Sequence, residues 1–319
     1  MNQIYHVQKQ SAQIRLDQWL KDIFPDLGLR GIRRLILTGQ ILLNGQIAKP
    51  GHKLEVGFEI TYKPKLQENL PEPNIIKETD DYIFFQKPAN IHTVALAGGQ
   101  ELALENAINN FTKSKNPPIL LQRLDFETSG IICAAKNEAA AEKFRQWESH
   151  GLIIKKYLAI LTGKLATAQI AKQDLDLTHK LVRPKLGQAH PTRQTYFEPL
   201  AFFLANSPWP NWFKAEKNYP PLDLTLVGCT LKIGHRHQIR AHAKSLNHPL
   251  WLDKKYGEII SPKEDEPSQS FYLHQAAIFL PDAFCLLWPD WLKKTEESKF
   301  IADWLNIKFK TMDLANGSC

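Results

Sequence analysis

The polar run from Gln122 to Gly130 constrains the fold of this chain more than any other segment. It lies between two short apolar runs, Ile119–Leu121 and Ile131–Ala135, and both are typical of buried strands. We therefore expect the polar residues on a loop at the end of a sheet, where rigid neighbours can orient the carboxylate of Asp125. Taken alone, its Arg-Leu-Asp is more typical of an ordinary charged turn between two strands.

The nine residues together resemble the Arg-Leu-Asp-x-x-Thr-Ser-Gly signature of the RluA-type pseudouridine synthases, and further motifs of that family occur in the family's order. They are Lys87-Pro88, Lys155-Lys156-Tyr157-Leu158-Ala159, Gly234-His235-Arg236-His237-Gln238-Ile239-Arg240, His248-Pro249, Asp253-Lys254-Lys255-Tyr256-Gly257 and Leu273-His274. The resemblance covers most of the chain. One such motif carries little weight, but the ordered set identifies the family.

The resemblance implies an enzyme that isomerises uridine to pseudouridine in RNA, and it assigns roles to single residues. Asp125 falls on the family's catalytic Asp, and Arg240 supplies the positive charge that keeps it ionised in a desolvated pocket. Tyr157 offers a ring that stacks on uracil and a phenol that can move a proton. The implied RNA contacts are Arg123, Arg236, His237 and Gln238, and Lys87 either packs near the site or contacts phosphate there.

The implied reaction breaks the bond between a sugar carbon and a base nitrogen, after which the uracil turns and rejoins through a carbon atom. A carboxylate suits this work because it can attack carbon and later leave, whether the carbon belongs to the sugar or to the base. The base must first leave its stack to meet Asp125, and Arg123 would hold the flipped nucleotide or fill the vacated space. No net redox or group transfer occurs, so we expect no cofactor.

Three residues depart from the family pattern. Gln122 precedes Arg-Leu-Asp where many relatives have His, Asn90 stands where Gly usually follows the Lys-Pro strand, and His235 takes the place of an Arg. The Asp, the Tyr and the final Arg are all retained. We therefore expect these departures to affect substrate choice rather than the chemistry.

Residues 13–63 resemble the small alpha-L RNA-binding domain named for a small-subunit ribosomal protein. A short helix from Arg15 and a second helix over 29–38 are followed by Asn44-Gly45, the strongest short hairpin signal. The second helix places Arg30, Arg33 and Arg34 on one face, since their spacing is i, i+3, i+4. A solvated helix face is the ordinary explanation, but in this context guanidinium groups suit RNA phosphates.

The charge distribution supports a polyanionic partner. Residues 1–65 carry ten Lys or Arg against five Asp or Glu, which is five of the seven net positive charges of the chain. A polar, proline-spaced linker follows at 64–74, and residues 75–310 form the second domain. The expected partner is structured RNA, with ribosomal RNA favoured over transfer RNA, and the default oligomeric state is a monomer.

The second domain alternates strand-like and helical patterns, which predicts an α+β fold on a mixed, mostly antiparallel sheet. The predicted strands are 82–86, 118–122, 131–135, 153–162, 223–233 and 271–280, and the predicted helices are about 102–111, 137–150, 237–247 and 291–306. The aromatic segment 206–222 is more typical of a packed surface loop than of a platform that stacks RNA bases.

Two other functions compete with a synthase. A metallohydrolase would use His235, His237 and His242, but on one helix His237 and His242 point about 140° apart, so we expect no metal. A non-catalytic RNA-binding or ribosome-assembly factor would keep the basic first domain and lose the site. Without a signal-peptide pattern, a long apolar run or paired cysteines, the default location is the reducing cytoplasm.

Overall fold

The computed structural model describes residues 2–25, 27–63, 72–95, 103–112, 116–179, 181–214, 222–257 and 271–306. The chain divides into two compact units, Met1–Glu72 with Ile91–Lys113 and Pro73–Asn90 with Ser114–Cys319. The domain limits 13–63 and 75–310 stay predictions. Residues 64–71 of the predicted linker and the end of the second domain, 307–310, lie outside the described residues.

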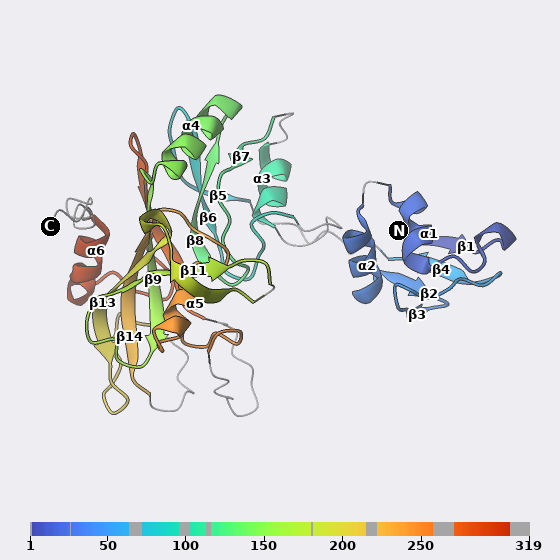
Figure 1. The fold of residues 1–319 in the computed structure, drawn as a ribbon. Helices are drawn as coiled ribbons and strands as arrows, with labels where there is room; N and C mark the ends of the chain where they lie inside the picture. The colour runs from blue at the N-terminus through green and yellow to red at the C-terminus, as the bar shows by residue number, and fades with distance from the viewer. Residues whose placement is uncertain are drawn as a thin grey trace. The chain divides into compact units, whose positions relative to one another are not determined.

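The first unit combines short helices with a small sheet (Figure 1). Its helices are α1 (Leu16–Ile23), α2 (Leu29–Leu37) and α3 (Leu104–Thr112), with a 3-10 turn at Lys9–Ser11. Its antiparallel strands lie in the order β1 (Gln3–His6), β4 (Glu59–Tyr62), β2 (Ile41–Leu43) and β3 (Gln46–Ile47). Leu16 and Leu20 of α1 and Ile32 and Ile36 of α2 are fully buried in one core, as the helical spacing of these apolar residues requires.

The predicted Asn-Gly hairpin is confirmed. β2 and β3 pair through Leu42–Ile47 and Leu43–Gln46, and the connecting Asn44 and Gly45 have φ of 49° and 79°. Both angles lie in the left-handed region, which Asn and Gly tolerate best and which a two-residue hairpin turn needs.

The second unit is built on one large mixed sheet (Figure 1). The strands follow in the order β10 (Gln169–Ala171), β13 (Thr195–Phe203), β14 (Leu224–Leu231), β9 (Ile154–Thr162), β15 (Leu273–Phe279), β8 (Ser129–Ala135), β6 (Tyr82–Lys87) and β5 (Asn74–Glu78). β16 (Phe284–Leu286) pairs with β15, and β7 (Ile119–Leu120) pairs with β8. Within the described part of the chain, β8 and β15 are parallel and the other neighbours are antiparallel, so the predicted sheet type is confirmed.

A separate hairpin and three helices complete the unit. The hairpin pairs β11 (Gln173–Asp176) with β12 (Arg183–Gln188). The helices are α4 (Glu138–Ser149), α5 (Gln238–Ser245) and α6 (Lys299–Asn306), with 3-10 turns at Pro191–Arg193 and Glu296–Ser298. No helix of the described residues is both long enough and apolar enough to cross a membrane.

The sequence-based assignment of elements needs correction in two respects. The helix expected over 291–306 begins only at Lys299, because the backbone around Leu292 pairs with the segment at Phe213 instead. The strands β5, β10, β11, β12, β13 and β16 were not predicted; β13 contains Pro199, which a bulge between Pro199 and Ala201 accommodates.

Aromatic side chains fill the core on one side of this sheet. Trp212 and Phe213 are buried there and Trp209 packs against them, so these members of the aromatic segment are packed rather than available to RNA; residues 215–221 lie outside the described residues. Cys133, Cys229 and Cys285 are buried free thiols, while Cys319 is not described.

Candidate active site

The loop between β7 and β8 carries Asp125, and a buried lysine holds this loop. Lys87 is fully buried at the end of β6, and its Nζ donates to the carbonyl oxygens of Pro88 at 2.9 Å, Phe126 at 3.2 Å and Thr128 at 2.7 Å. Burial lowers the pKa of Lys87 to about 7, and the charge of Asp125 acts in the opposite direction. The enclosed amino group already has three protein acceptors, which favours a packing role for Lys87 over a contact with RNA phosphate.

The glycine of the motif is needed where the loop enters β8. Gly130 has a φ of 130°, and a Cβ atom there would lie 2.4 Å from the backbone nitrogen of Gln275 in β15. Only glycine permits this approach of two strand backbones. The neighbouring Ser129 bonds His274 of β15, with 2.9 Å between Oγ and Nδ1. The loop is therefore anchored to β6 on one side and to β15 on the other.

A buried arginine contacts Asp125 from the first turn of α5. Arg240 Nη1 donates to Asp125 Oδ2 at 3.2 Å, while Nε and Nη2 donate to the two oxygens of Asp253 at 2.7 and 2.8 Å. Burial acts to lower the pKa of Arg240, but hydrogen bonding to Asp253 and the charges of both carboxylates raise it above its ordinary value. The guanidinium is thus a permanent cation shared between two carboxylates.

His237 approaches the other oxygen of Asp125. Its Nε2 lies 3.8 Å from Asp125 Oδ1, and its Nδ1 lies 3.0 Å from the hydroxyl of Tyr256. The residue begins α5 with a left-handed backbone, at a φ of 54°. Burial lowers the pKa of His237, although the charge of Asp125 opposes this effect. The ring is therefore mainly neutral at neutral pH.

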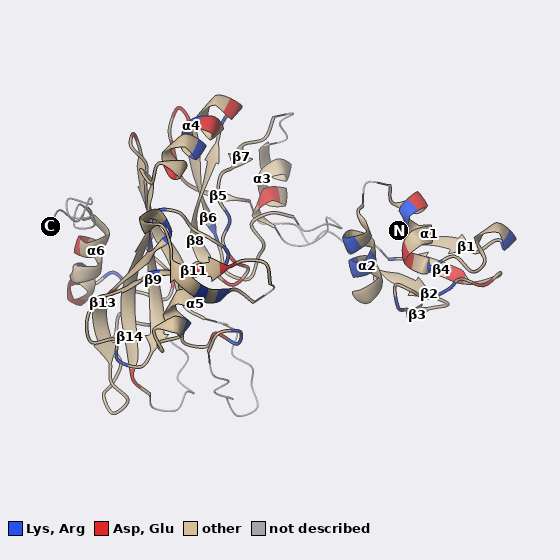
Figure 2. Cartoon of the chain, viewed as in Figure 1, with Lys and Arg blue, Asp and Glu red and all other residues tan. Residues whose placement is uncertain are grey.

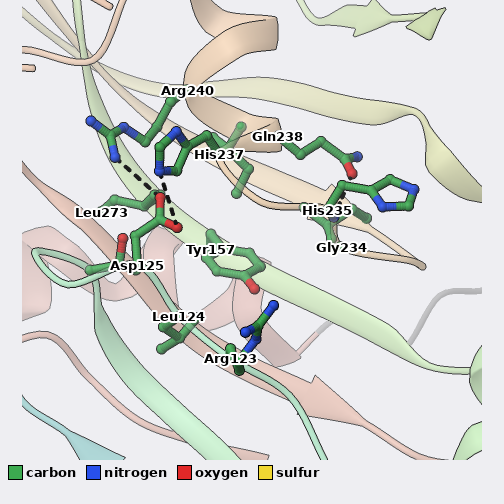
Figure 3. Close-up of a pocket in the computed structure, with 13 residues that line it drawn as sticks. Arg123, Leu124, Asp125, Tyr157, Gly234, His235, His237, Gln238, Arg240 and Leu273 are labelled. Carbon is green, nitrogen blue, oxygen red and sulfur yellow. Dashed lines mark hydrogen bonds and ion pairs between the residues drawn. The ribbon is translucent and has the colours of Figure 1, made fainter. Parts of the chain in front are cut away.

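Tyr157 presents its ring rather than its hydroxyl to Asp125 (Figure 3). The hydroxyl donates to Gln275 Oε1 at 2.7 Å. Burial raises the pKa of Tyr157, and the charge of Asp125 adds to this. The phenol therefore stays protonated, and what Tyr157 offers to a nucleobase is the flat surface of its ring.

These side chains line a single pocket (Figure 3). The walls include Arg123, Asp125, Tyr157, His235, His237 and Arg240. Its empty volume is about 370 Å³, part of which is open to solvent, and the Asp125 side chain is 19% exposed. A carboxylate that is mostly desolvated yet reachable fits a role in chemistry on a bound ligand.

The other residues of the α5 motif differ in what they can contact. Gln238 is buried, and its side chain accepts from His235 N at 3.0 Å and donates to Arg193 O and Thr195 Oγ1 at 2.8 and 3.0 Å. The amide thus ties the loop before α5 to the segment at residues 193–195, and the predicted RNA contact of Gln238 stays a prediction. Arg236 is exposed and donates to the carbonyl oxygen of Leu177 and to that of its near neighbour His179.

Three residues that complete the site were not assigned a role from the sequence. Asp253 and Tyr256 belong to a quoted family motif, but the motif alone does not say which side chains they meet. Gln275 follows Leu273-His274 and carries no signal of its own. Their roles depend on contacts with Arg240, His237 and Tyr157 that the motifs do not specify.

In the first unit, helix α2 displays the predicted arginines (Figure 2). Arg30 is exposed and Arg34 is half-buried. Arg33 Nε donates to Asp17 Oδ2 at 2.8 Å, and the fully buried Asp17 also binds Arg15 at 3.0 Å. Arg33 therefore has a protein partner, and Arg30 is the most available of the three.

Two histidines of the metal hypothesis, His237 and His242, have other partners. Both ring nitrogens of His242 are within hydrogen-bond distance of protein oxygens, Thr195 Oγ1 at 2.9 Å and Gln173 O at 3.0 Å. Among the described residues, no cluster of three or more His, Cys, Asp or Glu side chains is arranged to hold a metal ion.

Known proteins share this organisation. The relatives include ribosomal large subunit pseudouridine synthase C of Buchnera aphidicola, which is 27% identical over 80% of this chain and 81% of its own. Ribosomal large subunit pseudouridine synthase D of Escherichia coli is 26% identical over 76% of this chain and 72% of its own. The solved structure of human RNA pseudouridylate synthase domain containing 1 has the same fold, with a TM-score of 0.55 and 21% identity over 77% of this chain and 98% of its own.

Family models match both parts of the chain. Residues 14–60 match the S4 domain, and residues 81–245, more than half of the chain, match the RNA pseudouridylate synthases. The second match contains Asp125, Tyr157 and Arg240, the three residues that meet in the pocket. The chain belongs to the RNA pseudouridylate synthase family and carries an S4 domain ahead of the synthase domain.

Proposed function

We propose that this enzyme converts specific uridines of large-subunit ribosomal RNA to pseudouridine, with Asp125 as the nucleophile. The observation that carries the proposal is the placement of Asp125 beside the permanent charge of Arg240. The carboxylate is mostly desolvated and lies in a pocket that Tyr157 also lines. Relatives named for the large ribosomal subunit supply the choice of RNA.

The reaction needs a nucleophile that is charged, accessible and able to leave again. In the net change the bond between N1 and C1′ breaks, a bond between C5 and C1′ forms, C5 loses a proton and N1 gains one. The product is an isomer of the substrate, so no oxidant, reductant or second substrate is consumed. Asp125 fits because Arg240 donates a single hydrogen bond to it, at Oδ2, and none to Oδ1.

The target nucleotide has to leave its stack to reach the pocket. We assign the Tyr157 ring to stacking against the uracil, since its hydroxyl is held by Gln275. Arg123 lines the pocket and is exposed, so it can hold the flipped nucleotide or take its vacated place. We also assign phosphate contacts to the S4 domain and to Arg236, and we place the enzyme in the cytoplasm as a monomer.

The substitution Asp125→Asn tests the proposal. It keeps the shape of the side chain and removes the charge, so tritium release from RNA labelled at uracil C5 should fall to background while RNA affinity is retained. Asp81→Asn is the control, since Asp81 is a surface carboxylate that pairs with Lys143. Near-wild-type turnover by Asp125→Asn would refute the nucleophile assignment. A wild-type enzyme that binds ribosomal RNA and never modifies it would favour the non-catalytic RNA-binding factor.

A further inference from the structure

Behind Arg240 and His237 lies one short turn, residues 250–257, that contacts both of them. Asp253 is fully buried and takes two of the Arg240 donors, Nε and Nη2, at 2.7 and 2.8 Å. This pair fixes the plane of the guanidinium, and in that position it donates to Asp125 through Nη1, to Oδ2. Without the pair to Asp253, the guanidinium could rotate and hold both oxygens of Asp125 in a two-point pair.

The second contact runs from Tyr256 to His237. The Tyr256 hydroxyl accepts from Val182 N and lies 3.0 Å from His237 Nδ1. When this hydroxyl donates its own proton to Nδ1, the neutral imidazole carries its proton on Nε2, which faces Asp125 Oδ1. The hydrogen bond that Tyr256 makes thus orients the ring and favours the tautomer that Asp125 meets.

The turn itself is rigidly built. Asp253 Oδ1 also accepts the backbone N–H groups of Lys255 and Tyr256, at 2.9 and 3.2 Å. Gly257 leaves no room for a side chain, because a Cβ atom would lie 2.7 Å from Asp253 O. Leu252 has a φ of 68°, a costly backbone for a branched apolar residue that persists only where its surroundings impose it.

The turn is also fastened to the strand that carries Tyr157. Trp251 N donates to Ile160 O at 2.9 Å, and Thr162 N donates to Pro249 O at 2.9 Å. Both acceptor and donor belong to β9, so the turn and Tyr157 share one rigid support. Strand, turn and α5 therefore meet at Asp125.

We propose that the 250–257 turn positions both neighbours of the nucleophile, Asp253 through Arg240 and Tyr256 through His237. By limiting Arg240 to one hydrogen bond on Oδ2, the turn leaves Oδ1 as the attacking oxygen. Asp253 and Tyr256 are positioning residues, which do not touch the substrate. The inference rests on the proposed role of Asp125.

Single-turnover rates at saturating RNA test whether Asp253 acts through Arg240. Asp253→Asn keeps the acceptor for the turn but places an amide against the guanidinium. The rate should fall on the order of 100-fold, as for a small misplacement of a reacting group, with RNA affinity unchanged. In an Arg240→Lys background, which already lacks the two-point pair with Asp253, the same change should cause little further loss. Asp282→Asn, which removes a surface partner of Lys143, should leave the rate unchanged.

Tyr256→Phe removes only a hydroxyl and tests whether Tyr256 acts through His237. The rate should fall roughly 10-fold, at the lower end for loss of a group that orients a histidine. In a His237→Gln background, Tyr256→Phe should lower the rate little further. Tyr82→Phe is the matched control, since that buried hydroxyl donates to Ala140 O among other core residues.

Fully multiplicative losses in both double variants, or wild-type rates for both single variants, would overturn the inference. Urea unfolding of each variant checks its fold, and if Asp253→Asn does not fold, the Tyr256→Phe cycle alone decides. An inactive Asp125→Asn enzyme together with a fully active Asp253→Asn enzyme would leave the proposed function standing and reject the positioning role. An active Asp125→Asn enzyme would reject both.

Discussion

At the scale of single residues, the surroundings decide what a charged side chain does. Lys87 and Arg240 both belong to family motifs, and both are almost completely buried. Arg240 has two carboxylate partners and remains a cation next to Asp125. Lys87 has three carbonyl partners and holds the backbone of the loop that carries Asp125. The same sequence signal, a basic residue in a motif, thus corresponds to an electrostatic partner in one case and to a backbone brace in the other.

The role of Tyr157 can be separated into ring and hydroxyl. Tyr157→Phe keeps the stacking surface and loses the hydrogen bond to Gln275, so it should keep RNA affinity and a readily measured rate. Tyr157→Leu removes the flat ring, and we expect product formation to fall much further. Rates of pseudouridine formation and RNA affinities of both variants make the comparison. Equal losses of product formation in the two variants would instead identify the hydroxyl as the functional group.

At the scale of elements, the parallel pairing of β8 with β15 sets where the catalytic loop begins. This pairing joins Ser129 to His274 and Gly130 to Gln275. β15 also pairs with β9, so Gln275 lies between the loop of Asp125 and the ring of Tyr157. The close approach at Gly130 thus keeps the two halves of the site in register.

Gly130→Ala should disturb this junction. The added methyl group would overlap the Gln275 backbone, which cannot move away as a flexible side chain can, so we expect a loss of about 3 kcal/mol in unfolding free energy and a lower rate. Gly187→Ala is the control, because Gly187 also has a positive φ, 109°, but open space around it. It should cost about 1–2 kcal/mol from backbone conformation alone. Equal losses in urea unfolding would show that contact with β15 is not what requires glycine.

At the scale of the whole molecule, charge and chemistry are separated between the two units. The first 65 residues carry five of the seven net positive charges, whereas the pocket residues belong to the second unit. This separation predicts that RNA affinity and the chemical step respond to different substitutions. Arg33 pairs with the buried Asp17, so its replacement would also disturb the packing of the first unit, whereas Arg30 is exposed.

Replacing Arg30 and Arg34 by Gln should weaken RNA binding and flatten its salt dependence. Each lost phosphate contact lowers the slope of log affinity against log salt by about 0.7 to 0.9. The single-turnover rate at saturating RNA should remain near that of wild type. Arg145→Gln, which removes an exposed helical arginine of the second unit that pairs with Glu138, is the control. An unchanged affinity and salt slope for the double variant would reject the role of α2 in RNA binding.

Local sequence patterns were sufficient to predict several parts of the protein. The i, i+3, i+4 spacing gave the faces of α2, Asn44-Gly45 gave the hairpin, and apolar runs gave most strands of the second sheet. The ordered motifs also identified the family and the residues that meet in the pocket. These features depend on side chains and turns within about ten residues of one another, or on residue identities at fixed motif positions.

How these parts contact one another depends on tertiary packing, which local patterns do not encode. It enclosed Lys87, paired Arg240 with Asp253 and turned the Tyr157 hydroxyl to Gln275. It also shifted the start of α6 to Lys299, because the backbone at Leu292 pairs with another segment instead of forming a helix. The contact of Tyr157 with Gln275 depends on the order of strands in the sheet, which brings together groups more than a hundred residues apart. Local periodicity carries no information about that order, since the same strand patterns are compatible with many pairings.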